Sequence, residues 1–408
     1  MSERSGNTSR GSNGQEMRLS GTNLERAGDH NQRVTLHAIR VNGPITRAEL
    51  ATITGLTAPA IANITKRLLV DNLIQEAGRR RGGRGQPATK LVINPDSWFS
   101  LGLNVDRDHI TLVVLDFEGR VRARASREVN FALPKDVEQF FAKSVGKLLA
   151  KVGIGRERLV GVGVALPDDM PSAATLPQQP ANYGIWASTD VAALLTSSIH
   201  VPVFVENDAA AATMGEMQFG LGKKHQTFFY ILITAALGGS LVIDGNHFRG
   251  ATGRSGELGM LRGRDASGHE RQIQNIVSLS ALYSRLAAQG IKVSAPHELT
   301  ELPDSGQAII DAWVESAVDA LIDPVLAINC LVNPEVILIG GRLPAGIVDQ
   351  IANGLNQRVA TYGTTIPATA PVARAALSDD APAVGAAILP FSHRLLPTRT
   401  ALMKVAAL

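Results

Sequence analysis

The chain has 408 residues, of which 45% are hydrophobic, 19% are charged and only 4% are aromatic. This composition indicates a globular protein of two or three domains with an aliphatic core, and it excludes a disordered or fibrous chain. No apolar stretch resembles an export signal or is long enough to span a membrane. We therefore expect a cytoplasmic protein without membrane contacts.

The net charge of +3 is unevenly distributed. Residues 1–98 contain 14 Lys and Arg against 8 Asp and Glu, a net charge of +6, so the remainder carries −3. A basic front joined to a slightly acidic body predicts that nucleic acid is bound at one end only.

The first part of the chain carries the signals of three short helices. Residues 1–28 are polar and low in complexity, which predicts a disordered tail before a domain over 29–95. A first helix is expected over 31–41. Thr46 and Glu49 have the spacing of a capping box, so a second helix should begin there and end near Gly55. Thr57 can cap a third helix that runs to about Asp71.

Two expected strands, 72–77 and 89–93, flank a segment rich in Arg and Gly. Three helices followed by a basic hairpin predict a winged helix-turn-helix, although a small protein–protein module with a solvated basic loop is the alternative. Asn, Lys and Arg on a helix in the major groove can read bases, and a glycine-rich wing can approach phosphates. The predicted DNA-binding residues are Thr57, Ala58, Pro59, Asn63, Lys66, Arg67, Arg79, Arg80, Arg81 and Arg84.

From residue 98 to residue 408 the pattern changes to strands alternating with helices. This alternation predicts an α/β domain with two lobes. Strands are expected over 100–105, 110–116, 158–165, 201–205, 228–234, 241–243 and 336–339, and helices over 209–218 and 308–329.

Short motifs follow one another in a specific order within this region. Residues 161–167 read Gly-Val-Gly-Val-Ala-Leu-Pro, and residues 201–209 read Val-Pro-Val-Phe-Val-Glu-Asn-Asp-Ala. Residues 250–259 and 333–341 add two glycine-rich motifs. With this series the chain resembles the ROK family (repressors, open reading frames and sugar kinases) over 31–390. The resemblance implies a winged helix-turn-helix joined to a two-lobed, actin-like ATPase (ribonuclease H-like) domain.

The resemblance also implies a ligand site. In the kinases of the family, the Asp that matches Asp208 takes a proton from a sugar hydroxyl, a task that suits a positioned carboxylate. The positions that match Asn182, Asn207 and Glu257 contact the sugar, and Gln274 stands where a sugar-contacting Glu is usual. For Asp208 the alternative is a helix cap, because it precedes an expected helix.

The phosphate-binding motifs depart from the kinase pattern. Family kinases have Asp-x-Gly-Gly-Thr-Lys, whose backbone amides cradle ATP phosphates. Here residues 104–109 read Asn-Val-Asp-Arg-Asp-His, and the first glycines of a second phosphate segment, 234–240, are lost as well. These departures predict a domain with no catalytic residue and no cofactor.

Zinc is not expected either. The family often has a zinc-binding His followed by a cysteine cluster, but here Met260 stands at the His position. The one cysteine, Cys330, lies in an apolar segment and is interpreted as a plain core thiol.

Together these patterns predict a DNA-binding transcription regulator, with repression as the expected sign. It would bind a double-stranded DNA operator as a homodimer or homotetramer, and its kinase-like domain would sense a small sugar-like effector. Two alternatives remain: an ATP-dependent sugar kinase of the ROK family, and a ligand-free scaffold that is regulated by a protein partner.

Overall fold

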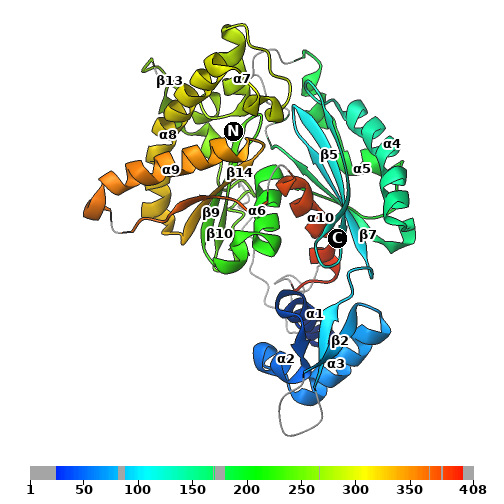
Figure 1. The fold of residues 1–408 in the computed structure, drawn as a ribbon. Coiled ribbons are helices and arrows are strands. Elements are labelled where there is room, and N and C mark those ends of the chain that lie inside the picture. Colours follow the sequence, from blue (N-terminus) through cyan, green and yellow to red (C-terminus); the bar gives the residue numbers. More distant parts are fainter. Residues whose placement is uncertain are drawn as a thin grey trace, which may run out of the picture.

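The computed structural model describes residues 24–80, 88–168, 170, 180–265, 267–366, 368–377 and 380–397. A small N-terminal head lies at one end of a larger body, and the body consists of two lobes (Figure 1). Among the described residues, no helix is both long and apolar enough to cross a membrane.

The head contains three helices and a small sheet. The helices are α1 (Leu24–Asn42), α2 (Arg47–Thr54) and α3 (Ala58–Val70). The strands β1 (Ile45–Thr46), β2 (Ile74–Arg80) and β3 (Ala88–Ile93) form an antiparallel sheet in the order β1-β3-β2. Residues 24–28 are helical, which contradicts their assignment to a disordered tail; residues 1–23 lie outside the described residues.

The turn between α2 and α3 has the local structure that its sequence predicts. The Thr46 backbone N–H donates to Glu49 Oε2 at 2.8 Å, and the Glu49 N–H donates to Thr46 Oγ1 at 3.3 Å, which completes the capping box. Gly55 ends α2 with a φ of 70°, a left-handed conformation that favours glycine. Thr57 caps α3 by accepting a hydrogen bond from the Ala60 N–H.

The first lobe is built on a five-stranded mixed sheet in the order β6-β5-β4-β7-β8. Strand β5 lies antiparallel to β4 and to β6, whereas β7 lies parallel to β4 and to β8. The helices α4 (Pro134–Val152) and α5 (Val191–Thr196) pack on one face, and α10 (Ala381–Arg394) packs on the other. The strands are β4 (Phe99–Val105), β5 (His109–Asp116), β6 (Val121–Glu128), β7 (Leu159–Leu166) and β8 (Val203–Asn207).

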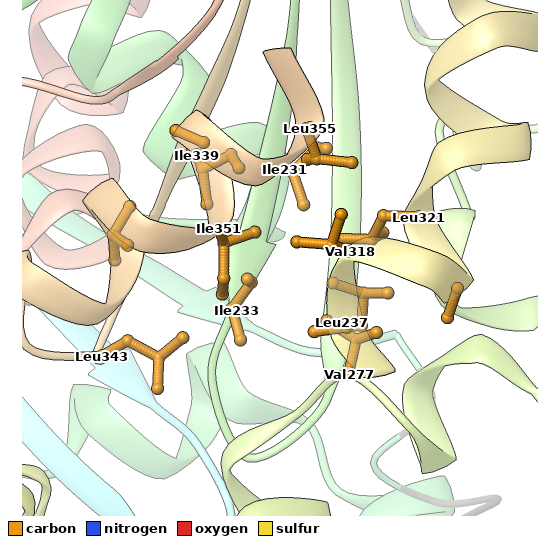
Figure 2. Packing of buried hydrophobic residues seen from close by; sticks show 14 of the residues in the cluster. Ile231, Ile233, Leu237, Val277, Val318, Leu321, Ile339, Leu343, Ile351 and Leu355 are labelled. Atoms are coloured by element: carbon orange, nitrogen blue, oxygen red, sulfur yellow. The ribbon is translucent and has the colours of Figure 1, made fainter. Parts of the chain in front are cut away.

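The second lobe has a five-stranded mixed sheet in the order β11-β10-β9-β14-β15. The helices α8 (Asp304–Val332) and α9 (Ala345–Thr361) cover one face, where Ile231, Ile351 and Val318 interdigitate (Figure 2). Two further elements, the hairpin β12–β13 (Arg262–Arg264 and Glu270–Gln272) and α7 (Leu279–Ala288), complete the lobe. The strands are β9 (Phe228–Ile233), β10 (Leu237–Ile243), β11 (Asn246–His247), β14 (Val336–Gly341) and β15 (Val372–Arg374).

Two helices lie side by side between the lobes, α6 (Asp208–Phe219) and α10 (Figure 1). A Cβ atom added to Gly385 of α10 would overlap the backbone carbonyl of Ala211 in α6. Only glycine permits so close an approach, and side chains in such a contact interlock without free space. We therefore describe α6 and α10 as one packed unit.

One sequence-based expectation about the core is wrong. Cys330 is exposed near the end of α8 and is not a core thiol. One side of the last turn of the helix faces solvent, so Leu331 is 85% exposed as well, whereas Asn329 on the other side is buried. The apolar character of the segment comes from Val325 and Ile328, which are buried.

Candidate DNA-binding face and ligand pocket

The third helix of the head has one buried and one exposed face. Ile61 and Leu68 are fully buried, whereas Asn63, Lys66 and Arg67 are exposed. The residues predicted to touch DNA at the start of this helix, Thr57, Ala58 and Pro59, are exposed too. A helix with exposed polar and cationic groups can enter the major groove of DNA.

A side-chain hydrogen bond sets the angle between the two helices of this motif. Arg47 Nε in α2 donates to Thr65 Oγ1 in α3 at 2.9 Å. Thr65 is fully buried and also donates to the Ile61 carbonyl. The orientation of α3 is therefore fixed by its contact with α2 and does not depend on the exposed residues that are predicted to read DNA.

The basic wing is described only at its base. Arg79 and Arg80 are the last residues of β2 and pair in register with Thr89 and Ala88 of β3. Arg81 and Arg84 fall within 81–87, outside the described residues. Their contact with DNA stays a prediction.

A pocket of about 340 Å³ opens in the body where β7 and β8 end and α6 begins. We call it the Asn207 pocket. Its size is that of small-molecule sites, and its walls combine apolar and polar groups. It is lined by Leu166, Pro167, Asp168, Met170, Trp186, Thr189, Val191, Val205, Glu206, Asn207, Arg249, Thr252, Gly253 and Arg254.

The sequence left open whether Asp208 contacts a ligand or caps the following helix. The hydrogen bonds at the start of α6 identify the cap. Asn207 is the N-cap residue, and its Oδ1 accepts a hydrogen bond from the Ala210 N–H at 3.0 Å. Asp208 is the first residue of the helix and is 8% exposed. Its Oδ1 accepts from the adjacent Ala209 N–H at 2.8 Å. The cap is therefore Asn207, which lines the pocket, whereas Asp208 follows it in the chain as the first residue of α6.

Two arginines that we did not predict complete the pocket. Arg249 donates to Glu206 Oε2 at 2.5 Å, and Glu206 is 8% exposed. Arg254 donates to Glu257 Oε1 at 3.0 Å and lies 3.8 Å from Asp168. Glu257 thus reaches the pocket through Arg254. Each guanidinium is matched by a carboxylate, so the lining favours a ligand with many hydroxyls that can both donate and accept hydrogen bonds.

The loop 104–109, which we predicted to correspond to the phosphate motif of the kinases, is closed on itself. The Asp106 N–H donates to the His109 carbonyl at 2.9 Å, and the Arg107 N–H donates to Asp106 Oδ1 at 2.7 Å. Asn104 Nδ2 lies 2.9 Å from His109 Nε2, and Asp108 Oδ1 lies 2.7 Å from His109 Nδ1. The backbone amides of Asp106 and Arg107 therefore already donate hydrogen bonds within the loop, whereas a phosphate cradle would need such amides to donate to the ligand.

A buried arginine of the second lobe holds this loop. Arg342 donates to Asp108 Oδ2 at 2.8 Å and to Glu128 Oε1 at 2.5 Å, and its side chain is 6% exposed. Burial alone would raise the pKa of Asp108, but the charges and hydrogen bonds of His109 and Arg342 outweigh it and lower this pKa to about 2. We call Arg342, Asp108 and Glu128 the lobe junction.

Among the described residues, Asp106, Asp108 and His109 are the three whose ligand atoms lie close enough to share a metal ion, within 4.8 Å of one another. Arg107 and Arg342 already supply positive charge to both carboxylates. A cation would have to displace these ion pairs, so the cluster is better described as part of the lobe junction.

Comparison with known proteins decides the family. The model of the ROK family matches residues 100–392, which is most of the chain. The chain belongs to the ROK family. An uncharacterized protein of Sinorhizobium fredii, y4fQ, is 29% identical over 88% of this chain and 90% of its own length. The xylose repressor of Bacillus spizizenii is 28% identical over 56% of this chain and 59% of its own length.

Solved ROK structures share the fold. A ROK family transcriptional regulator described as a homolog of the Escherichia coli MLC protein superposes with a TM-score of 0.63 at 21% identity, over 90% of this chain and 96% of that one. A ROK family glucokinase from Streptomyces griseus gives a TM-score of 0.53 at 22% identity, over 71% and 98%. The predicted fold, a winged helix-turn-helix with a two-lobed actin-like domain, is thereby confirmed.

The structure does not bring all five predicted ligand residues of the ROK domain together. Of the five, Asn207 lines the Asn207 pocket, Asp208 is its neighbour in the chain, and Glu257 is joined to the pocket through the lining residue Arg254. Asn182 is exposed and is not among the lining residues. Gln274 is 5% exposed, donates to Gln272 Oε1 at 2.9 Å and lines a different cavity. Sequence reasoning missed Arg249 and Arg254, although Arg254 stands within the glycine-rich motif 250–259 that we singled out and Arg249 directly precedes it.

Proposed function

We propose that this ROK protein is a sequence-specific DNA-binding transcription regulator and that it acts as a repressor. The Asn207 pocket would sense a sugar or sugar-derived effector, and the kinase-like domain would be catalytically inactive. Named relatives are repressors, which supports the proposed sign of regulation. The exposed residues of α3 support the proposed partner, a double-stranded DNA operator.

One observation carries the proposal: a single helix joins the pocket to the DNA-binding head. The first turn of α6 contains Asp208, beside the pocket. At its other end, Gln218 Oε1 accepts a hydrogen bond from Arg40 of α1, and the Phe219 ring centroid lies 5.5 Å from the Arg40 guanidinium carbon. We call Arg40, Gln218 and Phe219 the head junction.

The neighbouring helix reaches the same element of the head. Arg33 of α1 donates to the backbone carbonyls of His393 and Leu396, at the end of α10, at 3.3 and 3.5 Å. Because α6 and α10 are one packed unit, a ligand that moves the start of α6 would displace both contacts with α1. Differential binding of the ligand to two such arrangements would change operator affinity.

The kinase alternative is disfavoured by the closed loop. Kinases of this fold need free backbone amides around the ATP phosphates, and the Asp106 and Arg107 amides donate within the loop. Asp108, which stands at the Thr position, pairs with Arg342 across the cleft. ATP with magnesium should therefore be neither bound nor consumed.

The proposed oligomer is a homodimer or homotetramer. A helix-turn-helix reads a half-site, and two copies related by a twofold axis read a pseudo-palindrome with half-sites about one helical turn apart. Sedimentation of the protein with selected DNA tests this proposal, because a stable 1:1 complex on a palindromic duplex would contradict it.

The DNA part of the proposal is tested by selection of duplexes from a random pool, followed by fluorescence anisotropy. The affinity should fall steeply with salt, because bound cations release counterions from DNA. Replacing both Lys66 and Arg67 by Ala should weaken binding at least tenfold, since charge-assisted contacts of about 1–3 kcal/mol are lost. Unchanged affinity would reject α3 as the recognition helix.

The effector part is tested with a panel of sugars, read by thermal shift and by operator affinity in the absence of ATP. An effector should stabilise the protein and change its operator affinity. Asp208→Asn should weaken the effector by about tenfold, because a carboxylate that accepts hydroxyl hydrogen bonds is lost. Asp304→Asn, an exposed Asp at the start of α8, is the matched control. Sugar-dependent ATP turnover that disappears in Asp208→Asn would establish the kinase instead.

A further inference from the structure

A small cavity lies between the head and the body and shares no lining residue with the Asn207 pocket. We call it the neck cavity. It encloses about 220 Å³, which is room for a ligand of roughly six to ten non-hydrogen atoms. The head contributes residues of α1 and the residue before β2, and the body contributes the end of α10 and the residue after it.

Three leucines form the apolar part of the lining. Leu36 of α1 and Leu73 are buried, and Leu395, directly after α10, is half-buried. Leu36 and Leu73 belong to a buried cluster that also contains Phe391 of α10, so the head and the body share one core here. An aliphatic group that entered the cavity would extend this core, because it would leave water for an apolar surface.

Two arginines contribute positive charge to the same cavity. Arg33 donates through Nη1 to the carbonyls of His393 and Leu396, and its other N–H groups have no partner among the described residues. Arg394 is exposed and forms no hydrogen bond or ion pair within the part of the chain that the structure describes. Guanidinium groups with available donors favour a carboxylate, which accepts hydrogen bonds through both of its oxygens.

One acidic residue, Asp29, also lines the neck cavity. It is exposed and has no ion-pair partner in the described ranges, although it lies one turn before Arg33 on α1. Two arginines against one aspartate leave a net charge of +1, which favours an anion over a cation. An ammonium group on the same ligand would find its partner in Asp29.

The neck cavity lies beside the joint of the recognition helix and the wing. Helix α3 ends at Val70, and Asn72, with a φ of 57°, turns the chain toward β2. Leu73 follows this turn directly and lines the cavity. The Asn94 side chain donates to the Asn72 carbonyl at 3.0 Å, which ties the turn to the end of β3. A ligand in the cavity would therefore touch the segment that joins the two parts of the head that are predicted to contact DNA.

We propose that the neck cavity binds a small aliphatic carboxylate, either a simple carboxylic acid or an apolar α-amino acid. Its carboxylate would bind Arg33 and Arg394, and its chain would lie against the three leucines. The ligand would touch the head and the body at once and so hold the head in its present orientation. Binding at this site does not depend on the effector assigned to the Asn207 pocket.

The test uses the full chain, with hexanoate as the probe and its neutral isostere hexanamide as the control, at constant ionic strength. Isothermal titration and thermal shift measure binding. Hexanoate should bind at least tenfold more tightly than hexanamide, because only the acid can form charge-assisted hydrogen bonds with the arginines. From acetate through butanoate to hexanoate, the affinity should rise about fourfold for each added methylene group.

Norleucine, which is hexanoate with an α-ammonium group, distinguishes the two sources of the carboxylate. Tighter binding of norleucine than of hexanoate identifies an amino acid as the ligand class, and the reverse order identifies a simple acid. Asp29→Asn should weaken the binding of norleucine and leave that of hexanoate unchanged. Both results depend on the neck cavity and on no residue of the Asn207 pocket.

Substitution of the exposed arginine tests the site without disturbing the fold. Arg394→Gln should weaken hexanoate binding by about five- to tenfold, because one charged donor is lost, while the melting temperature without ligand stays unchanged. Arg156→Gln, at an exposed arginine outside the cavity, should bind hexanoate normally. Asp208→Asn should also leave hexanoate binding unchanged while it weakens the sugar response, so the two proposals can fail separately.

Three results would overturn the neck site. The first is that neither hexanoate nor norleucine binds. The second is that hexanamide or inorganic phosphate binds as tightly as hexanoate, since the site would then not recognise an aliphatic carboxylate. The third is that Arg394→Gln binds hexanoate like the natural chain.

Discussion

Two arginines join the parts of this molecule, and they do so in opposite electrostatic settings. Arg342 at the lobe junction lies between the carboxylates of Asp108 and Glu128, which raise its pKa despite burial. Arg40 at the head junction has a neutral amide and an aromatic ring as its partners, and burial lowers its pKa to about 10. The charge of Arg342 is compensated by two carboxylates. The charge of Arg40 has only a neutral amide and an aromatic ring to offset the cost of its desolvation.

The difference indicates which junction can move. Separating the lobes would break the ion pairs of the buried Arg342 guanidinium with Asp108 and Glu128. Separating α1 from α6 would instead return a poorly compensated cation to water, which offsets much of the contact energy lost. A second cation near the head junction, Lys223, lies 5.8 Å from the Phe219 ring centroid and lowers the cost of opening further. We therefore expect the head to shift on a body that stays closed.

The largest effect should come from removing the arginine of the lobe junction. Arg342→Met removes a buried guanidinium from the half-buried carboxylate of Asp108 and from the exposed carboxylate of Glu128, which should lower the free energy of unfolding by about 3 kcal/mol. Arg358 also donates to two carboxylates, those of Asp319 and Glu315, but its side chain is 45% exposed. Arg358→Met should cost less than about 1 kcal/mol. Urea denaturation measures the free energy of unfolding of both variants. Equal losses would show that the buried ion pairs of Arg342 contribute no more than the exposed ones of Arg358.

The head junction should respond to mild acid. Burial, with a smaller contribution from Arg40, lowers the pKa of His37 to about 4. The unfolded chain binds this proton near pH 6.5 and the folded chain does not, so stability is complete above pH 6.5 and is lost as the pH falls toward 4. The loss should approach about 3 kcal/mol. His37→Gln should flatten the difference between pH 7 and pH 5 in thermal melts, whereas the exposed His200→Gln should not.

The lobe junction should resist acid to a much lower pH. Because the pKa of Asp108 is lowered to about 2, its contribution is complete above the unfolded value near 4 and is lost between pH 4 and pH 2. That contribution is about 2 kcal/mol. Asp108→Asn should therefore lose stability less steeply than the natural chain in this range. A parallel decline in both proteins would show that His109 and Arg342 do not hold Asp108 in its ionised form.

Much of this architecture could be predicted from local sequence signals. The capping box at Thr46 and Glu49, the Gly55 turn and the Thr57 cap act within one helical turn, so their residue types determine their geometry. The strands β4, β5, β7 and β9 could be recognised as apolar runs because they are buried on both faces. The motif 201–209 placed Asn207 and Asp208 at a strand-to-helix turn, and the structure has them there.

The contacts between distant segments could not be predicted in this way. Arg342 lies 234 residues from Asp108, and Arg40 lies 178 residues from Gln218. No spacing rule connects such positions, so the pairing of Asp108 with Arg342 could not be foreseen. Gln274 was assigned to the sugar site by alignment across an altered loop, and the packing of η6 (Ile273–Asn275) turns it toward Gln272.

The smallest effect on stability, and the most informative on function, should come from Arg40→Met. Methionine keeps an apolar stem against Phe219 and removes a cation that has no carboxylate partner in the part of the chain that the structure describes, so stability should change by less than about 1 kcal/mol. If α6 transmits the state of the Asn207 pocket through this arginine, the effector should still stabilise the variant, and operator affinity without effector should stay near normal. The change in operator affinity that the effector causes should then shrink severalfold.

The matched control for this variant lies two turns earlier on the same helix. Arg33 donates to backbone carbonyls at the end of α10 at 3.3 and 3.5 Å, so Arg33→Met removes weaker contacts and leaves the link to α6 intact. Its effector response should remain close to that of the natural chain. Anisotropy titrations of the operator, with and without effector, compare the two variants. If both respond like the natural chain, α6 does not act through Arg40; if Arg33→Met alone loses the response, the signal passes through α10.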